Sequence, residues 1–206
     1  MAAVTYDPRE VKRMLSALPE ELRDKASAMA INKTADKAKT EMKRQIAAVY
    51  NLKSSEIGGA LKTTKASAAK NIMSASLYPV SLSGSRTGRA MNVIHFLESS
   101  TTLAQAKKRA KAGTLQQLFF KIKKGSAAKT IGKEGDKSAP FIGNNGRTVF
   151  RRTGKSRTPI EPVQVIDTRQ MFNTAALNQA VLNKAAADLL VETQRAVDLM
   201  LSRLNT

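Results

Sequence analysis

The sequence has no cysteine, no tryptophan and a single histidine among its 206 residues. Without cysteine the chain can form neither a disulfide framework nor a thiolate zinc site, and it offers no cysteine nucleophile. The lone histidine, His95, excludes sites with several histidine ligands, and its apolar neighbours favour a structural role. We therefore expect a protein that works without redox chemistry, without a metal and without any other cofactor.

Long hydrophobic runs are also missing. No stretch of about 18 apolar residues occurs, so no membrane span is expected, and residues 1–13 lack the apolar core of a signal peptide. Hydrophobic residues nevertheless make up 42% of the chain, whereas aromatic residues make up only 4%. These proportions predict a soluble protein made in a cytoplasm, with a core of Ala, Leu, Ile, Val and Met in long helices.

Acidic residues are scarce in the middle of the chain, which argues against catalysis. Between residues 57 and 160 the acids are Glu98, Glu134 and Asp136, and the last two lie in a Gly-rich segment. A glycosidase needs two carboxylates in one cleft, and a magnesium nuclease needs clustered acids near its strands. Gly-rich phosphate-binding motifs are absent as well. We predict that the protein is not an enzyme, has no small-molecule substrate and carries no catalytic, cofactor-binding or metal-binding residues.

Basic residues dominate instead, because 35 Lys and Arg stand against 16 Asp and Glu, a net charge of +19. Residues 51–160 carry +17 of it, while residues 1–50 carry +3 and residues 161–206 carry −1. Two acid-free clusters supply the candidates for contact with DNA or with an acidic protein: Lys107, Lys108, Arg109, Lys111, Lys121, Lys123, Lys124, Lys129, Arg147, Arg151, Arg152, Lys155 and Arg157. Such clusters bind phosphate by releasing counterions, and they fit an acidic protein surface equally well, so both partners stay open.

Hydrophobic periodicity predicts helices near both ends of the chain. Asp7-Pro8 is a helix-start signal, and Pro19 divides the helical stretch 7–50 into two helices. A last helix is expected over residues 171–204, whose interior has neither Gly nor Pro. The apolar stripes of the two long helices are Leu22, Ala26, Met29, Ala30, Ala38, Met42, Ile46 and Val49, and then Leu182, Ala186, Leu189, Val197, Met200 and Leu204.

Residues 70–165 form the predicted sheet region. The expected strands are 71–77, 92–97, 115–124, the two arms of a hairpin over 140–152, and an edge strand at 158–163. The hairpin turn, Gly143-Asn144-Asn145-Gly146, contains residues that tolerate positive φ. A basic loop or arm is expected near residues 99–139. This order of helices, strands and one more helix predicts a single α+β domain over 1–206, with N-terminal helices and a long C-terminal helix packed on a mainly antiparallel sheet.

Three pieces of the sequence carry a family resemblance. They are Ala-Met-Ala-Ile-Asn-Lys at 28–33, Ala-Pro-Phe-Ile at 139–142 followed by Asn-Gly and Arg-rich residues, and Gly-Lys-Ser-Arg-Thr-Pro-Ile at 154–160. In this order they resemble the lambda-type minor tail protein Z family of tailed bacteriophages. Residues 84–114 depart from the pattern of that family.

The resemblance implies a structural virion protein that completes the head-proximal end of the tail and supports head–tail joining and DNA passage. It implies ring assembly without catalysis, with a homo-hexamer expected from the six-fold tail, and a location in the virion tail or neck after assembly in the host cytoplasm. Implied partners are the tail terminator, the tail tube or head-connector proteins, and genomic DNA in the lumen. The side chains of Phe141, Ile142, Val149 and Phe150 are expected to pack the sheet against the helices, with the hairpin arginines facing outward.

Two other functions stay open on the sequence. A basic nucleic-acid-binding protein of the ribosomal or nucleoid type explains the net charge directly, although it explains the nearly neutral last helix less well. Another neck component, such as a head-closure or adaptor protein, would differ from a tail-completion protein only in its position in the particle.

Overall fold

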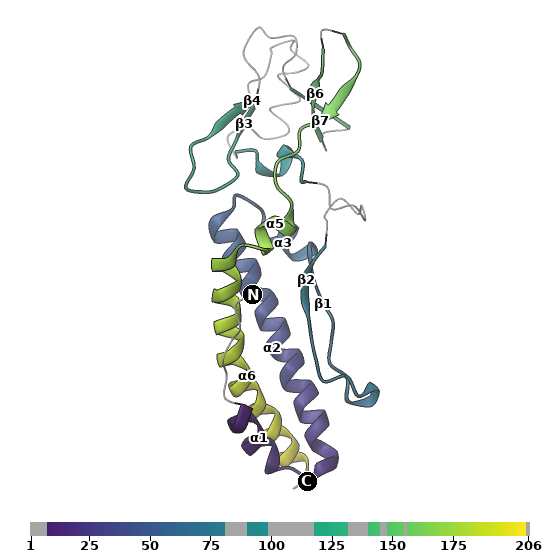
Figure 1. Ribbon diagram of the computed structural model, residues 1–206, viewed down its shortest axis with the longest axis vertical. Coiled ribbons are helices and arrows are strands. Elements are labelled where there is room, and N and C mark those ends of the chain that lie inside the picture. Colours follow the sequence, from purple (N-terminus) through teal and green to yellow (C-terminus); the bar gives the residue numbers. More distant parts are fainter. Residues whose placement is uncertain are drawn as a thin grey trace. The chain divides into compact units, whose positions relative to one another are not determined.

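The computed structural model describes residues 8–80, 90–98, 118–131, 140–144, 148–154 and 156–204. Helices lie near both ends of the chain and short antiparallel strands lie between them in the sequence (Figure 1). Contacts divide the chain into two compact units: unit 1 is Met1–Ile46, Gly58–Val80 and Phe172–Thr206, and unit 2 is Ala47–Ile57 and Ser81–Met171. The predicted α+β class is confirmed, and the single domain over 1–206 stays a prediction. None of the described helices combines the length and apolar character that a membrane span needs.

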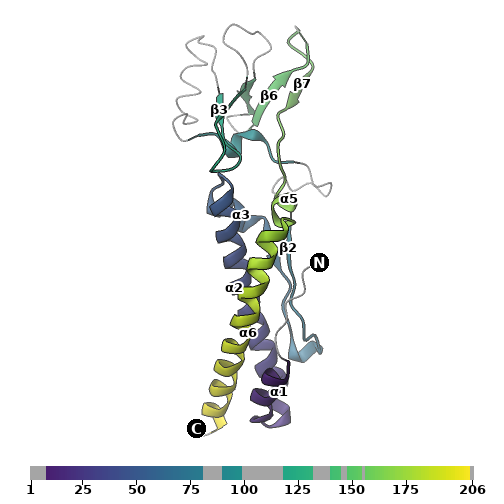
Figure 2. The same ribbon diagram turned by 60° about the vertical axis from the view of Figure 1, so that its left-hand side comes forward.

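Two 30-residue helices dominate unit 1. Helices α2 (Glu20–Val49) and α6 (Ala175–Leu204) lie side by side in both ribbon views (Figures 1 and 2). Helix α1 (Pro8–Ser16) begins at proline, whose fixed φ suits the first helical position. Small side chains let the helices approach closely, and the buried cluster that joins them consists of Leu18, Ala26, Ala30, Ala196, Val197 and Met200. The predicted stripe of α2 is therefore largely confirmed, although Val49 is 36% exposed.

The C-terminal helix begins later than predicted. A short helix, α5 (Thr168–Phe172), comes first, and α6 starts only at Ala175. Asn173 and Thr174 lie between them, and such side chains favour turns and helix ends over helix interiors. The prediction that Leu204 belongs to the buried stripe is wrong, because this residue is 53% exposed at the end of the helix.

A two-stranded ribbon completes unit 1. Strands β1 (Leu61–Thr63) and β2 (Leu77–Pro79) are antiparallel, and the short helix η1 (Ala68–Lys70) lies in their connection. The strand predicted at 71–77 is wrong for most of its length. The reason is that a strand needs a hydrogen-bonded partner, and regular pairing with β1 begins only at Leu77.

Unit 2 contains two small antiparallel sheets. One is the hairpin of β3 (Leu118–Phe120) and β4 (Lys129–Ile131), and the other has the order β5-β6-β7. Its strands are β5 (Phe141–Gly143), β6 (Thr148–Arg152) and β7 (Ile160–Pro162). The predicted hairpin and edge strand are confirmed. Of the expected basic loop or arm near 99–139, the described part is this β3–β4 hairpin, and the remainder lies outside the described residues.

The core of unit 2 forms around Val93 and Val149, which are both fully buried. Val93 belongs to a 3-10 helix, η2 (Val93–Phe96), so the strand predicted at 92–97 is wrong. The side chain of Asn92 explains the difference. Its oxygen accepts hydrogen bonds from the backbone N–H groups of Ile94 and Val149 at 3.1 and 2.9 Å, and its amide donates to the Val149 carbonyl at 3.0 Å. Asn92 therefore caps η2 and also holds the backbone of β6 at Val149.

The β5–β6 hairpin has two different faces. Ile142 packs with Val149 against the core of unit 2, as expected for an inward-facing pair. The rings of Phe141 and Phe150 stack on each other instead, with centroids 6.0 Å apart. Gly143 leaves room for this arrangement, because a Cβ at that position would lie 3.0 Å from the Phe150 ring. The four residues therefore divide between a core face and an aromatic face.

Candidate functional site

The β3–β4 hairpin presents the clearest group of unpaired positive charge. Lys123, Lys124 and Lys129 are exposed, and among the described residues no carboxylate oxygen lies within 4.0 Å of their ammonium groups. The backbone that carries them is held firmly, because Lys124 N–H donates to the Val49 carbonyl and Asn51 N–H donates to the Ile122 carbonyl, both at 2.9 Å. The hairpin therefore offers free lysine side chains on a fixed backbone.

Three other candidates already have partners. Lys121 lies 3.3 Å from a carboxylate oxygen of Glu98, and Arg151 lies 3.2 Å from one of Glu161. The guanidinium of Arg152 lies over the ring of Phe141, 4.9 Å from its centroid, as in a cation–π contact. These pairings reduce the positive charge available to a ligand at the same positions. Both ion pairs are partly exposed, so each holds its lysine or arginine only weakly.

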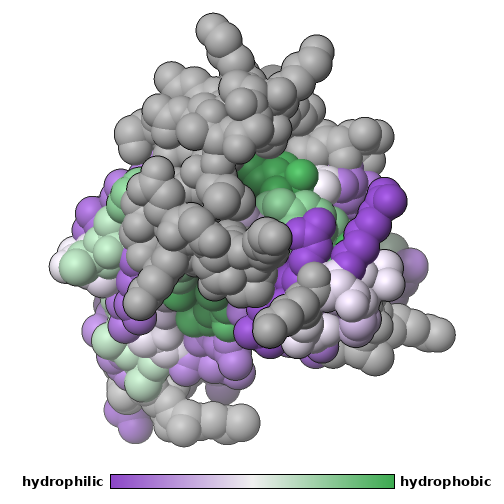
Figure 3. Space-filling view, turned by 90° about the horizontal axis from the view of Figure 1, so that it is seen from above, coloured by the Kyte–Doolittle hydropathy of each residue, from purple (hydrophilic) through white to green (hydrophobic). Residues whose placement is uncertain are grey.

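Of the remaining basic candidates, one is exposed and the others lie outside the described residues. Arg157 is exposed and has no ion pair among the described residues. The others lie outside the described residues: Lys107, Lys108, Arg109, Lys111, Arg147 and Lys155. The structure thus brings Lys123, Lys124 and Lys129 together on one hairpin and places Arg157 on a separate loop. The space-filling view from above shows hydrophilic residues exposed next to separate hydrophobic areas (Figure 3).

His95 makes a specific contact within unit 2. Its Nδ1 atom lies 2.8 Å from Oε1 of Glu56, which belongs to helix α3 (Ser54–Gly59). Both side chains are about one-third exposed or less, at 32% and 27%. The pair thus joins α3 to η2 inside unit 2. Within the part of the chain that the structure describes, no group of three or more His, Asp or Glu is placed to hold a metal ion.

A network of ion pairs joins α2 to α6 in unit 1. Lys37 on α2 lies 2.6 Å from Glu192 and 3.5 Å from Asp188, and both carboxylates are on α6. Each carboxylate also pairs within its own helix, Asp188 with Lys184 at 3.0 Å and Glu192 with Arg195 at 2.6 Å. Hydrophobic periodicity does not predict this network, because Asp188 and Glu192 are buried although they are charged. A signal existed in their spacing of four residues along one helix face.

Electrostatic contacts shift several pKa values along the same pair of helices. A hydrogen bond from Lys37 lowers the pKa of Glu192, against the opposing effect of burial, and the same contact raises the pKa of Lys37. Hydrogen bonds from Arg44 and then Gln45 lower the pKa of Glu41 to about 2. These carboxylates are therefore charged at neutral pH and bound to cations of the same unit, so they serve the packing of the helices.

A comparison with protein families matches residues 10–205 to the sequence model described as prophage minor tail protein Z (GPZ). The matched range covers most of α1 and every later helix and strand. No curated protein and no solved structure matches the chain.

Proposed function

Because the chain belongs to the prophage minor tail protein Z family, and is therefore a structural protein of a bacteriophage tail, we propose that it completes the head-proximal end of that tail. There it supports head–tail joining and DNA passage by assembling into a ring, expected to be a hexamer, and it acts without catalysis. Its neighbours are the tail terminator, the tail tube or head-connector proteins. The protein would assemble in the host cytoplasm and remain in the virion neck.

The free lysines of the β3–β4 hairpin carry this proposal furthest. Lys123, Lys124 and Lys129 have no acidic partner among the described residues, so binding a polyanion breaks no ion pair of the protein itself. Phosphate groups that meet such side chains release condensed counterions, which favours binding without any reading of bases. A ring repeats the three lysines once per subunit around its axis. That repetition supports contact with DNA in a lumen, where the sequence of the genome cannot matter.

An acidic protein neighbour is the second candidate for the same unit. The observation that favours it is Arg152 over the ring of Phe141, which stacks on Phe150, because arginine and aromatic side chains are enriched at the centres of protein interfaces. In that case the basic residues join the subunit to the next ring of the neck, and DNA passes without contacting them.

Charge reversal at the hairpin tests the proposed function. We expect Lys123→Glu, Lys124→Glu and Lys129→Glu together to lower the yield of infectious particles at least about tenfold, because six charge units change at one surface. The matched control reverses Lys12, Lys25 and Lys70, three exposed lysines of unit 1 with no ion pair among the described residues. Plaque titre and electron microscopy of head–tail joining are the measurements.

The two candidate partners give different results with purified protein. If DNA is the partner, the triple variant should lose binding to duplex DNA, and the slope of log K against log salt should fall by about 2 to 3. If an acidic protein is the partner, DNA binding should stay the same while joining fails. Normal titres for the triple variant, in particles that contain the protein, would contradict the proposed role of the hairpin.

A further inference from the structure

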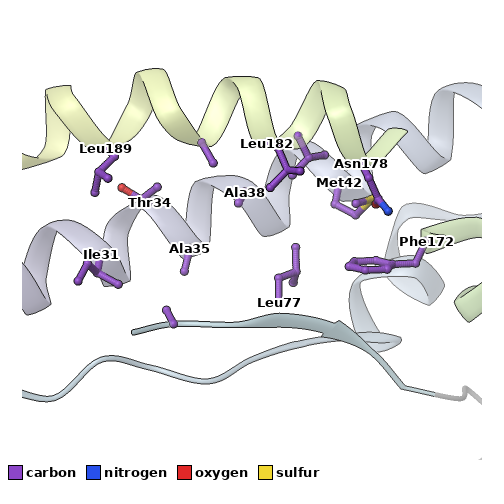
Figure 4. A pocket seen from close by; sticks show the side chains of 13 residues that line it. Ile31, Thr34, Ala35, Ala38, Met42, Leu77, Phe172, Asn178, Leu182 and Leu189 are labelled. Atoms are coloured by element: carbon purple, nitrogen blue, oxygen red, sulfur yellow. The ribbon is translucent and has the colours of Figure 1, made fainter. Parts of the chain in front are cut away.

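An uncharged groove lies within unit 1, on the side of α2 and α6 that faces β2 (Figure 4). Side chains from both helices and Leu77 from β2 point into the space between them. Its volume is about 470 Å³, in the range of pockets that hold a ligand or a short peptide. The lining contains no charged residue and consists of Ile31, Thr34, Ala35, Ala38, Met42, Ala75, Leu77, Phe172, Asn178, Val181, Leu182, Ala185 and Leu189.

The strand beside this groove has a free edge. The carbonyl of Ser76 accepts from Thr64 N–H at 2.9 Å, and Val80 N–H donates to the Ala60 carbonyl at 2.7 Å. The backbone groups of the even-numbered residues along β2 therefore point toward β1. Because hydrogen-bonding groups alternate along a strand, the N–H and C=O groups of Ala75 and Leu77 point the other way. The two-stranded sheet has no third strand there among the described residues. Ala75 and Leu77 also line the groove. The groove therefore runs along a strand whose outer edge has unpaired backbone groups.

Contacts on the β1 side explain why the groove stays open. The Asn32 side chain exchanges two hydrogen bonds with the backbone of Ala66, at 2.9 and 2.8 Å, and Asp36 pairs with Lys65 at 2.7 Å. These bonds fix the ribbon to α2 at its β1 side. The pocket is lined by β2 and α6 but not by β1, so the ribbon covers α2 while the face of α6 lacks a strand.

The chemistry of the lining indicates what would fill it. A charged or helical partner fits poorly, because the walls offer no counter-ion and the free edge of β2 needs an extended backbone. The buried Thr34 Oγ1 also has no hydrogen-bond partner, and a passing peptide group could supply one. An extended, uncharged peptide satisfies all three features, since its backbone pairs with β2 while alternate side chains enter the groove.

This chain does not offer such a segment among its described residues. Of its uncharged extended stretches there, 140–144 and 163–166 already pair with neighbours in unit 2, and 71–80 forms one wall of the groove itself. We propose that the groove binds an extended, uncharged segment of a different tail protein, which adds to the free edge of β2 as a third strand. The proposal rests on the proposed function only in that it places the protein in an assembled tail.

Filling the groove is the first test. Ala185→Phe puts an aromatic ring into the groove, and Ala187→Phe adds the same ring to an exposed position of the same helix. Both purified variants should keep the helical circular dichroism and cooperative unfolding of the parent. We expect Ala185→Phe to lower the yield of infectious particles at least about tenfold and Ala187→Phe to leave it unchanged. Equal titres for the two folded variants would overturn the proposal.

Blocking the strand edge is the second test, with crosslinking as the readout. A photoreactive phenylalanine at Leu182, inside the groove, is compared in purified particles with one at Val191, which is 46% exposed on α6. We expect the Leu182 probe to crosslink to an uncharged extended segment of another tail protein. Ala75→Pro, which removes a free-edge N–H without touching the β1 pairing, should abolish that crosslink.

Each remaining outcome decides against the proposal. A crosslink only to the same chain or to a second copy, or none above the Val191 probe, would overturn the assignment of the groove while the protein is still present in particles. Absence of the protein from particles would overturn the proposed function itself. The two failures are therefore distinguished by one immunoblot of the purified virions.

Discussion

The two units use their charges in opposite ways. Unit 1 carries 16 basic and 10 acidic residues, a net +6, and unit 2 carries 19 and 6, a net +13. In unit 1 the buried carboxylates Glu41, Asp188 and Glu192 bind cations of the same helices. In unit 2, Lys123, Lys124 and Lys129 of the β3–β4 hairpin have no acid beside them among the described residues. The ion pairs of unit 1 stabilise the packing of its helices, whereas the unpaired lysines of the exposed hairpin in unit 2 remain available to bind a partner.

The largest expected effect separates the folding of the two units. Val149→Asp places a carboxylate at a fully buried position of the unit 2 core and should cost about 4 kcal/mol or more. Hydrogen exchange followed by mass spectrometry should show lost protection in β5, β6 and η2, with protection retained in α2 and α6. Val191→Asp, at an exposed position of α6, is the control. Equal loss of protection in both units would contradict the division.

A smaller effect is expected from the residue that joins η2 to β6. Asn92→Ala leaves the N–H of buried Val149 without its partner and removes one of the two donors to its C=O, which keeps the bond from Val163 N–H. The free energy of unfolding should therefore fall by about 2 kcal/mol. Asn183→Ala removes an amide that is exposed on α6, so a change below about 0.5 kcal/mol is expected. Chemical denaturation of both variants is the measurement, and equal midpoints would show that Asn92 is not the link.

Loss of the interhelical cation should destabilise unit 1 less. Lys37→Met leaves the buried carboxylates of Asp188 and Glu192 with only their own-helix partners, so the urea midpoint should fall while its m-value stays constant. Lys33→Met is the matched control, because Lys33 lies one turn earlier on α2, is exposed and has no ion pair among the described residues. A urea midpoint for Lys37→Met that is higher than that of the parent would contradict the stabilising role of the ion-pair network.

The smallest expected effect is the acid dependence of unit 1. The folded pKa values of Glu41 and Glu192 lie below the ordinary value, so these carboxylates stabilise the fold above about pH 4.5. The contribution of Glu41 is lost as the pH falls toward its folded pKa of about 2, and that of Glu192 is lost as the pH falls through its own lowered folded pKa. The reason is that the unfolded chain binds more protons in this range. Helical circular dichroism in urea across pH 5 to 2 should show this loss, and Glu41→Gln should make it shallower, with the exposed Glu21→Gln as control. If the loss of helical signal with falling pH were as steep in Glu41→Gln as in the parent, Glu41 would not be a source of the acid dependence.

Prediction from sequence succeeded where local signals were strong. Pro8 and Pro19 located the first two helices, and the Asn-Gly turn with its flanking apolar residues located the β5–β6 hairpin. It failed where a distant partner decided the conformation. Residues 92–97 have strand composition, yet the contact of Asn92 with Val149 fixes a 3-10 helix there. Charge alone also could not show that Lys121 is paired while Lys123 and Lys124 are free, because Glu98 is 23 positions away in the chain.

By itself, the amino-acid sequence determined the fold class, the absence of cysteine chemistry, the concentration of basic charge between residues 51 and 160, and the family. These properties follow from composition, periodicity and motif order, which do not depend on three-dimensional contacts. Tertiary structure alone decided which charges are neutralised, which side of the β1–β2 ribbon is closed, and which strand edge remains open. Each of these depends on residues far apart in the chain coming within hydrogen-bonding distance, and local sequence patterns do not encode such distances.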